Sequence, residues 1–557
     1  MEPNRYFYPR LIDSLQGYDK ARFKADLYSG VTVGVIALPL AIAFAIASGA
    51  KPEAGIFTAI IAGFIISAFG GSRVQVGGPT GAFIVIVYGI ILQYGYVNLL
   101  ICTVMAGIML LMMGLLRMGS LIKFFPRPLV TGFTSGIAVL IILSQVKEFF
   151  GLQIAVMPSD FIGKLQAIFV AAHTADLTTF LLALGSALLI WFYPKKMAHL
   201  LPAPIVTLIL GTLLVSLFNL PVETIGTRFG GIPQTLPSLS IPPFEFSTIH
   251  FLMAPAMTIA LLGAIESLLS ASVADGMIDD KHDPNQELMA QGLANMVTPF
   301  FGGLPATGAI ARTAVNVRSG ATSPISGIVH ALTLLIIVLV AAPMAKHIPL
   351  ATLSGILLIV GLNMGEWESF TTMHRYPKSD SAVLMATFLL TVIIDLTVAV
   401  EVGMFIAIFT FIQRITALTH VSIEDESTHD DDEERAVLRK DVPEGVVIYR
   451  VFGALFFGAA DKLETVLLES KSDPDVLILK MHEVISMDAS ALHTLEHLFN
   501  TLRKRGKHLI LCGPHTQPYF LMHQAGFFER VGRENVVATV ERALFRAKAL
   551  LNLSETA

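Results

Sequence analysis

This chain of 557 residues is poor in charge and in cysteine. Only 15% of its residues are charged, whereas 54% are hydrophobic. Soluble globular proteins carry about 25% charged residues, so the composition argues against an ordinary soluble enzyme. The chain has two cysteines, Cys102 and Cys512. Two cysteines are too few for a disulfide framework or for a zinc site built from cysteine.

Several functional motifs are also missing. The sequence has no Walker or dinucleotide-binding glycine pattern, so ATP-driven transport has no support. The net charge of −5 includes no basic tail, and no nucleic-acid partner is expected. The first 28 residues lack the apolar core and small-residue cleavage site of a signal peptide. We therefore expect the transmembrane segments themselves to direct insertion.

The charges that are present are unevenly distributed. Residues 1–420 contain 22 Lys and Arg and 21 Asp and Glu, whereas the shorter stretch 421–557 contains 16 and 22. This contrast predicts a membrane domain followed by a soluble one. We expect a cytoplasmic N-terminal segment at 1–28, a transmembrane domain at 29–420, an acidic linker at 421–435 and an α/β domain at 436–557.

The apolar runs predict 14 transmembrane segments. Twelve of these are full spans: Val31–Ser48, Ile56–Phe69, Asn98–Leu116, Leu129–Val146, Thr178–Phe192, Ile205–Phe218, Met253–Ala274, Gln286–Phe300, Pro324–Ala342, Leu350–Leu362, Ala382–Ile394 and Thr397–Ile412. The other two, Thr80–Leu92 and Thr307–Val317, are shorter, begin at Gly and Pro residues, and are expected to be half-helices. The segments divide into seven plus seven, in repeats of about 29–219 and 250–420.

The basic residues predict the topology. With the N-terminus inside, 16 Lys and Arg residues of the first 420 fall on the cytoplasmic side and five on the other. This asymmetry satisfies the positive-inside rule for 14 segments in the lipid bilayer. We expect a multi-pass protein of the plasma (inner) membrane with both termini in the cytoplasm.

A short internal sequence repeat is the most informative feature of the chain. The sequence from Gly78 to Phe83 (GPTGAF) recurs from Pro305 to Ile310 (PATGAI), seven predicted segments later. An odd number of segments reverses direction, so the halves are expected to be inverted repeats. The Gly and Pro residues of each copy are expected to interrupt the helix. Each such break exposes backbone N–H groups at a helix N-terminus, where the helix dipole contributes roughly half a positive charge. Two such ends facing each other predict an anion site.

Two ionisable residues lie within predicted segments close to this motif. Glu266 is expected to carry a proton, to ligate Na⁺ together with Ser267 or Ser270, or to serve as a structural hydrogen-bond partner. Arg312 either adds a fixed positive charge beside the anion or pairs with Glu266. Phe44 in the first segment is a candidate wall of the site.

A cluster of acids follows the predicted span Met253–Ala274. It consists of Asp275, Asp279, Asp280 and Asp283, with His282 among them. A metal site is conceivable there, but a solvated loop is expected, and we predict no metal and no cofactor. In the soluble part, Val446–Val451, Val476–Lys480 and His508–Cys512 are predicted strands, Ala489–Arg505 is a predicted helix, and further helices are expected around Tyr519–Gln524 and Val540–Leu551. Asp488 is placed to cap the helix that follows it.

These segments resemble the sulfate permease (SulP) family of anion transporters. The strings that carry the resemblance are Ala37–Phe57 (ALPLAIAFAIASGAKPEAGIF), Gly70–Phe83 (GGSRVQVGGPTGAF), Leu262–Asp275 (LGAIESLLSASVAD) and Gly302–Gly327 (GGLPATGAIARTAVNVRSGATSPISG). The soluble tail is similar to a STAS domain. Its Ser490 would be the phosphorylatable serine of that domain, but Ala489 and Ala491 depart from the common Asp-Ser-Ser-Gly form, which argues against phosphorylation.

The resemblance implies an α-helical polytopic membrane protein with a 7+7 inverted repeat, a core domain and a gate domain. It places the substrate between the first, third, eighth and tenth segments and implies an elevator motion of the core against the gate. The implied substrate contacts are Phe44, Thr80, Gly81, Ala82, Thr307, Gly308, Ala309, Ala311 and Arg312. Glu266 falls on the position associated with coupling ions. The family is typically homodimeric, and its STAS domains offer a surface for a cytoplasmic protein partner.

The resemblance leaves the substrate open among sulfate, bicarbonate, chloride and C4-dicarboxylates, with some likeness to bacterial dicarboxylate carriers. We expect secondary active transport, coupled to H⁺ through Glu266. The alternatives are a sodium-coupled bicarbonate transporter, an uncoupled anion exchanger or channel, and a membrane sensor that signals through its STAS domain.

Overall fold

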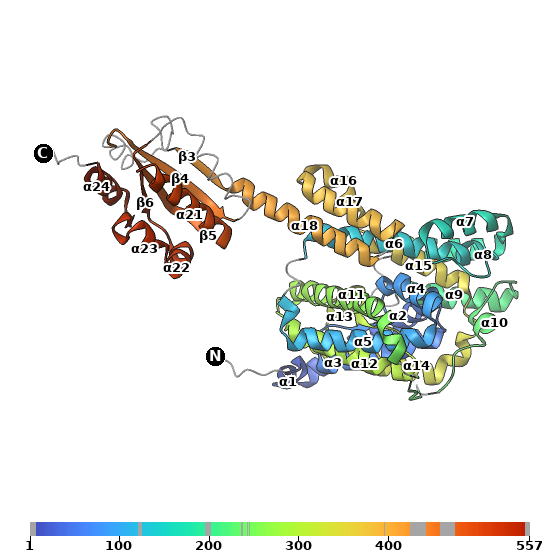
Figure 1. Cartoon of the computed structure of the whole chain (residues 1–557). Helices are drawn as coiled ribbons and strands as arrows, with labels where there is room; N and C mark the ends of the chain where they lie inside the picture. Colours follow the sequence, from blue (N-terminus) through green and yellow to red (C-terminus); the bar gives the residue numbers. More distant parts are fainter. Residues whose placement is uncertain are drawn as a thin grey trace. The chain divides into compact units, whose positions relative to one another are not determined.

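The computed structural model describes residues 7–120, 125–194, 202–235, 238–241, 243, 246–394, 396–423, 442–456 and 474–551. The chain divides into two compact units, residues 1–404 and 405–557 (Figure 1). Helix α18 (Leu396–Leu418) runs from the first unit into the second. The predicted acidic linker lies outside the described residues from position 424 onward.

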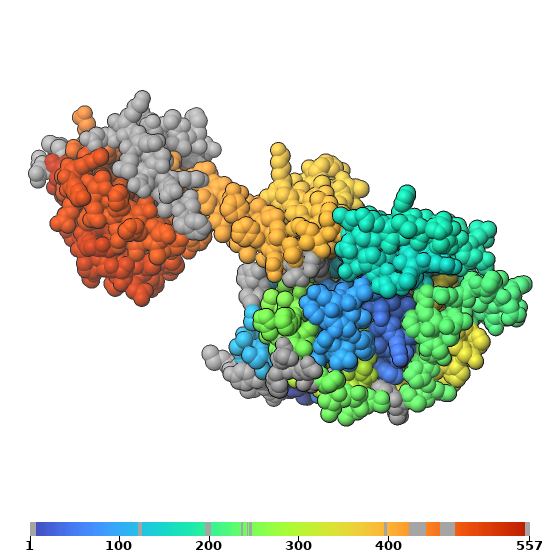
Figure 2. All heavy atoms as spheres, turned by 45° about the vertical axis from the view of Figure 1, so that its right-hand side comes forward, coloured from blue at the N-terminus to red at the C-terminus, as the bar shows by residue number. Residues whose placement is uncertain are grey.

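The first unit consists of two groups of helices, and Figures 1 and 2 show the second group lying over the first. The first group, here called the core group, comprises α2 (Lys20–Ala47), α3 (Pro52–Phe69), α4 (Ile84–Tyr94), α5 (Tyr96–Leu115), α11 (Phe246–Ile278), α12 (Pro284–Val297), α13 (Ile310–Arg318) and α14 (Ile325–Ala345). The second, here called the gate group, comprises α6 (Arg127–Phe150), α7 (Phe161–Ala171), α8 (Leu177–Trp191), α15 (Leu350–Met364), α16 (Trp367–Thr372) and α17 (Lys378–Ile393). The remaining helices are α1 (Arg10–Leu15), α9 (Ala203–Phe218) and α10 (Ile225–Phe229).

Each predicted transmembrane segment overlaps a helix, although several helices are longer than predicted. Helix α2 begins at Lys20 rather than Val31 because the Asp19 carboxylate accepts a hydrogen bond from the Arg22 N–H at 2.8 Å and caps the helix. Among the described residues, eight helices are long and apolar enough to cross a membrane, or nine if the bent pair of α7 and α8 counts as one. The count of 14 spans therefore stays a prediction.

In the described part of the first unit, four α-helices were not predicted from the sequence. They are α1, α7, α10 and α16, which are 6, 11, 5 and 6 residues long. Helices α7 and α8 meet at an angle of 119°. The bend falls where the Asp176 carboxylate starts α8 by accepting hydrogen bonds from the N–H and hydroxyl of Thr179, at 2.7 and 2.6 Å. Short helices lack the long apolar run by which spans are found.

The two predicted half-helices begin with non-helical backbone. Thr80 precedes a 3₁₀ turn, η1 (Gly81–Phe83), which continues into α4. The second begins as a strand, β2 (Thr307–Gly308), and becomes helical only at Ile310. Strand β2 pairs antiparallel with β1 (Gly77–Gly78), so the two breaks run in opposite directions past each other. The pairing satisfies backbone groups that no helix serves.

Small residues bring the helices of the core group together. The Cα of Gly107 in α5 lies so close to α12 that a Cβ there would be 2.6 Å from the Met296 nitrogen and 2.7 Å from the Gly292 oxygen. Close backbone approach of this kind is the usual packing mode of helices in membranes, where apolar burial alone does not drive association. Only glycine fits at this crossing.

The second unit contains a five-stranded sheet of order β3-β4-β5-β6-β7. Its strands are β3 (His420–Ile423), β4 (Val446–Leu455), β5 (Val476–Met487), β6 (His508–Cys512) and β7 (Val536–Val537). Only the β3–β4 pair is antiparallel. Its helices are α21 (Ala489–Lys504), α22 (Thr516–Gln524), α23 (Phe527–Val531) and α24 (Val540–Leu550).

The predicted strands and helices of the soluble part are confirmed. Side chains alternate between the two faces of the sheet, with Leu477 packing in the cluster of α21 and Ile478 in that of α24. The predicted cap is confirmed as well, because the Asp488 carboxylate accepts a hydrogen bond from the Ala491 N–H at 2.8 Å. Strand β3 was not predicted, since its residues fell at the border of the predicted linker.

The close crossing of α5 and α12 predicts that alanine is tolerated less well at Gly107 than at a glycine outside the crossing. We expect Gly107→Ala to destabilise the protein by about 1–3 kcal/mol because the new methyl group overpacks the crossing. The matched change Gly89→Ala, in α4 where a Cβ would meet no atom within 4 Å, should be neutral or stabilising. Thermal unfolding of both variants in detergent measures the difference. Equal unfolding temperatures would contradict the close approach.

Candidate functional site

A cavity of about 820 Å³ lies between the core group and the gate group. On the core side it is lined by residues of α2, η1, α11 and α13, and on the gate side by residues of α6 and α15. Eight of the ten predicted site residues line it: Phe44, Thr80, Gly81, Ala82, Glu266, Ala309, Ala311 and Arg312. Residues more than 220 positions apart in the sequence thus meet at one cavity.

The other two predicted site residues, Thr307 and Gly308, do not line the cavity. They form strand β2, where each pairs with a glycine of β1. The Thr307 hydroxyl donates to the Gly263 carbonyl of α11 at 2.9 Å. Their role here is to hold the broken backbone against α11, which corrects the expectation that Thr307 opens a half-helix.

Glu266 lines the cavity, is buried, and is hydrogen-bonded to a neighbouring residue of the core wall. Its carboxylate accepts a hydrogen bond from the Thr80 hydroxyl at 2.9 Å, and the residue is 9% exposed. This bond joins the middle of α11 to the start of η1. A carboxyl group in such a place is expensive to keep charged, so a protonatable or ligand-binding role is favoured over a passive one.

Arg312 is buried on the opposite side of the same break. One guanidinium nitrogen, Nη2, donates to the Pro79 carbonyl, while Nη1 has no hydrogen-bond partner among the described residues. Arg312 likewise forms no ion pair with Glu266 within the part of the chain that the structure describes. One arm of the Arg312 guanidinium thus secures the backbone before Thr80, while the charges of Arg312 and Glu266 still act on each other, and both roles expected for Arg312 stay predictions.

The two helix starts that line the cavity carry no side-chain caps. The side chains of Thr80, which precedes η1, and of Ala309, which precedes α13, accept no hydrogen bond from the first turn, although both backbone carbonyls do. The Thr80 hydroxyl is directed to Glu266 instead. Uncapped N–H groups at a helix start attract anions, because they combine free donors with the positive end of the helix dipole.

The gate group contributes a wall that sequence reasoning missed. Most of these residues are apolar, and they include Val130 and Phe133 of α6 and Val360 and Met364 of α15. Three polar residues, Arg127, Asn363 and Glu366, line both this cavity and a neighbouring one of about 710 Å³. The two cavities therefore adjoin at these residues. The signal for them in the sequence was weak, since apolar residues of a span do not reveal which face lines a cavity.

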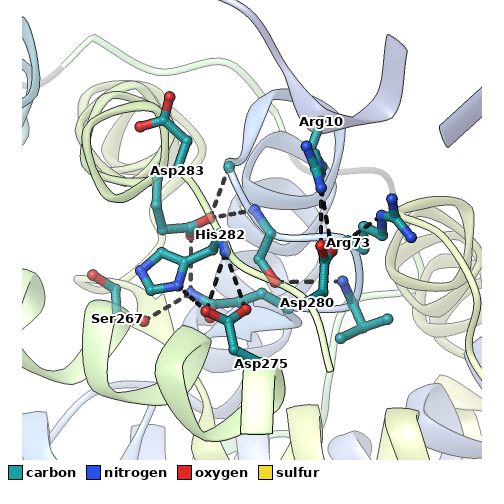
Figure 3. Close-up of polar contacts among 12 residues, drawn as sticks. Arg10, Arg73, Ser267, Asp275, Asp280, His282 and Asp283 are labelled. Carbon is teal, nitrogen blue, oxygen red and sulfur yellow. Dashed lines mark hydrogen bonds and ion pairs between the residues drawn. The ribbon is translucent and has the colours of Figure 1, made fainter. Parts of the chain in front are cut away.

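The acidic cluster after α11 is a network of partnered side chains (Figure 3). Asp280 pairs with Arg10 at 3.0 Å and with Arg73 at 3.1 Å. Asp275 lies 2.6 Å from the His282 ring, and Asp283 caps α12. Residues 279–283 form an irregular segment in which Asp279, Lys281 and Asp283 are exposed, so the segment is a solvent-exposed loop that also contains paired side chains. The described residues contain no group of three or more His, Cys, Asp or Glu side chains that could hold a metal ion.

Two further buried ionisable residues were missed by the sequence analysis. Glu287 in α12 and His330 in α14 are both fully buried. Neither imidazole nitrogen of His330 has a hydrogen-bond partner among the described residues. The rule that singled out Glu266, an ionisable residue within a predicted span, would have found both.

Comparison with known proteins decides the family. Residues 23–387 match the profile of the sulfate permease family. The chain belongs to the sulfate permease family. Residues 438–543 match the STAS domain profile, so this member carries a C-terminal STAS domain. Both predicted resemblances are confirmed.

Its similarity to curated members extends over nearly the whole chain. It is 43% identical over 528 residues to the putative sulfate transporter YvdB of Bacillus subtilis, covering 94% of this chain and 98% of that protein. It is 31% identical over 538 residues to the bicarbonate transporter BicA of Picosynechococcus, covering 94% of each.

A solved structure supports the fold of this sulfate permease family member. The structure of murine Slc26a9, described as an anion transporter in the inward-facing state, superposes with a TM-score of 0.86. The match covers 97% of this chain and 94% of that chain, at 19% identity. At this identity the likeness establishes the fold alone. It is a mostly helical membrane transporter fold with a STAS domain.

The contact between Gly78 and Arg312 yields a test of the site. Gly78 has a φ of +148°, and a Cβ there would lie 2.6 Å from Arg312 Nη1. We expect Gly78→Ala to displace Arg312 and to lower the apparent affinity for sulfate or bicarbonate about tenfold, so that a higher anion concentration is needed for the same thermal stabilisation. Thermal-shift titration measures the change.

The control for this test is Gly320→Ala. Gly320 has a φ of +91°, but a Cβ there would meet no atom within 4 Å. It therefore reproduces the backbone strain without moving Arg312. Equal loss of affinity in the two variants would contradict the proposed contact.

Proposed function

We propose that this protein is a proton-coupled secondary transporter of a small anion, sulfate or bicarbonate. The observation that carries the proposal is the meeting of two uncapped helix starts, the Arg312 guanidinium and the Glu266 carboxyl at one cavity. The first three attract an anion, and the fourth is a group that can bind a proton together with it. The relatives named as sulfate and bicarbonate transporters support the substrate class.

We propose H⁺ rather than Na⁺ as the coupling ion because the carboxyl group of Glu266 can bind a proton by itself, whereas sodium prefers several oxygen ligands. The Ser267 hydroxyl donates to the Ala264 carbonyl at 3.1 Å, and the Ser270 hydroxyl donates to Thr313 at 3.3 Å, so neither hydroxyl donates to the Glu266 carboxylate.

We propose an elevator mechanism within a 14-span, 7+7 inverted repeat. The antiparallel pairing of β1 with β2 supports the inversion, because equivalent breaks in the two halves run in opposite directions. The core group supplies Thr80, Glu266, Arg312 and both helix starts, so the groups proposed to hold the anion and the proton lie together on one helix group. That placement lets the core carry the bound anion past the gate.

We further propose that the protein lies in the plasma (inner) membrane as a homodimer, with both termini and the STAS domain in the cytoplasm. The excess of basic residues on one side of the predicted topology supports this orientation. In this arrangement the STAS domain contributes to assembly or to transport rate, and the anion contacts only the transmembrane unit.

The role of Glu266 can be tested with a carboxamide. Glu266→Gln retains the shape of the side chain but cannot carry a proton, so we expect anion uptake into proteoliposomes to lose its dependence on an inward proton gradient. Glu53→Gln, in the first turn of α3 and outside the cavity, should retain that dependence. Uptake of labelled sulfate and bicarbonate is measured with proton, sodium or no gradient. If uptake by the unmodified protein is driven by a sodium gradient, the coupling ion is Na⁺ and the proposal of H⁺ is wrong. If uptake by Glu266→Gln still depends on the proton gradient, Glu266 is not the coupling residue.

Removal of the STAS domain tests the separation of binding from regulation. A chain that ends at Leu418, the last residue of α18, should bind sulfate or bicarbonate with an affinity within about twofold of the full chain, because every cavity-lining residue is retained. Transport rate or the dimer fraction should change. Loss of anion affinity would show that the STAS domain takes part in binding.

A further inference from the structure

A second buried carboxylate, Glu287, lies behind the broken backbone rather than in the cavity. It is in the first turn of α12 and has no exposed surface. Oε2 accepts hydrogen bonds from the backbone N–H groups of Gly71 at 2.9 Å and Ser72 at 3.3 Å. Oε1 accepts from the side-chain amides of Gln75 and Gln291, both at 2.9 Å. Glu287 is thus surrounded by four N–H donors.

No cation is directly bonded to this carboxylate in the described part of the chain. Glu287 forms no ion pair there, so the four N–H donors are its direct partners, while His282 acts on its charge from further away. The side-chain oxygens of Gln75 and Gln291 have no hydrogen-bond partners in the described part of the chain. Both amides therefore direct their nitrogens to Glu287 at the expense of their own oxygens. The negative charge sets the orientation of both amide groups.

Gln75 relays this orientation to both elements of the site. Its amide nitrogen also donates to the Ser267 carbonyl at 3.2 Å, the contact drawn beside Ser267 in Figure 3. Ser267 follows Glu266 directly in α11. The same amide packs on Gly308 of β2, where a Cβ would overlap the Gln75 nitrogen and lie 3.2 Å from the Ser267 Cα. One amide thus touches the helix that carries Glu266 and the strand that precedes Ala309.

We propose that Glu287 is a positioning residue for the anion site and that it acts through Gln75. Its charge holds the Gln75 amide between Ser267 and Gly308, and that amide sets the spacing between α11 and β2. The spacing in turn determines how far Glu266 lies from the start of α13. The proposal rests on the function proposed above, because it assigns Glu287 a role in the affinity of that same site.

Glu287→Gln tests this role with minimal change of shape. The new NH₂ group meets N–H donors on every side, so Gln75 must turn its oxygen toward it and give up the Ser267 carbonyl. We expect amide hydrogen exchange to accelerate about tenfold or more in two separate stretches, the loop at 70–76 and the strand and helix start at 305–313. We also expect KM for anion uptake to rise about tenfold with a smaller change in kcat.

Asp26→Asn is the matched control. Asp26 is also fully buried and accepts from backbone N–H groups, those of Thr322 at 2.6 Å and Ser323 at 3.1 Å. It lies in α2, bonds to residues that precede α14, and forms no hydrogen bond with Gln75 or Ser267 in the part of the chain that the structure describes. We expect a comparable loss of thermal stability without faster exchange at 305–313 and without the rise in KM.

Gln75→Met tests whether Glu287 acts through the Gln75 amide, and it replaces Glu287→Gln as the test variant if that protein fails to fold. It leaves the bonds of Glu287 to Gly71, Ser72 and Gln291 in place, yet it should accelerate exchange at 305–313 as much as Glu287→Gln does. The double variant should add little to either single change. Acceleration confined to 70–76, or full additivity, would overturn the proposal. Hydrogen exchange can be measured whether or not the protein transports an anion. If the unmodified protein moves no anion, the proposed function is contradicted, but the exchange rates at 70–76 and 305–313 still test the role of Glu287.

Discussion

The structure of the first unit depends on one constraint: non-helical backbone inside an apolar bundle must find its hydrogen bonds within the protein. The pairing of β1 with β2 meets part of this need. Side chains meet the rest, since Asn295 both donates to the Ala306 carbonyl and accepts from the Ala306 N–H at 2.8 Å. Asn316 donates to the Val74 carbonyl at 2.8 Å, and Thr58 accepts from the Leu304 N–H. Several buried polar residues of the core group thus serve the non-helical backbone.

The chemistry of the site follows from what this network leaves unsatisfied. The helix starts after Thr80 and Ala309 keep their N–H groups uncapped, and Arg312 keeps one nitrogen without a partner among the described residues. Most of these donors are backbone N–H groups, which attract negative charge with little selection for shape. The named relatives of this chain include both sulfate and bicarbonate transporters.

Both helix groups give the cavity a wall of mixed polarity. The polar residues of the core wall are Thr80, Glu266 and Arg312, and those of the gate wall are Arg127, Thr134, Asn363 and Glu366. The remaining lining residues on both sides are apolar or glycine. Arg127, Asn363 and Glu366 mark the place where the two cavities adjoin.

The sequence by itself determined the class of the protein, the positions of its apolar helices and the strands and helices of the soluble part. These features follow from local composition and periodicity, which are readable along the chain. It also identified Glu266 and the two breaks, because an ionisable residue or a Gly/Pro break within an apolar run stands out on its own. Only the tertiary structure decided that Thr307 and Gly308 form a strand, that Arg312 binds the Pro79 carbonyl, and that Glu287 holds Gln75 against α11. Those contacts join residues more than 200 positions apart, and no local pattern records which partner a buried donor will find.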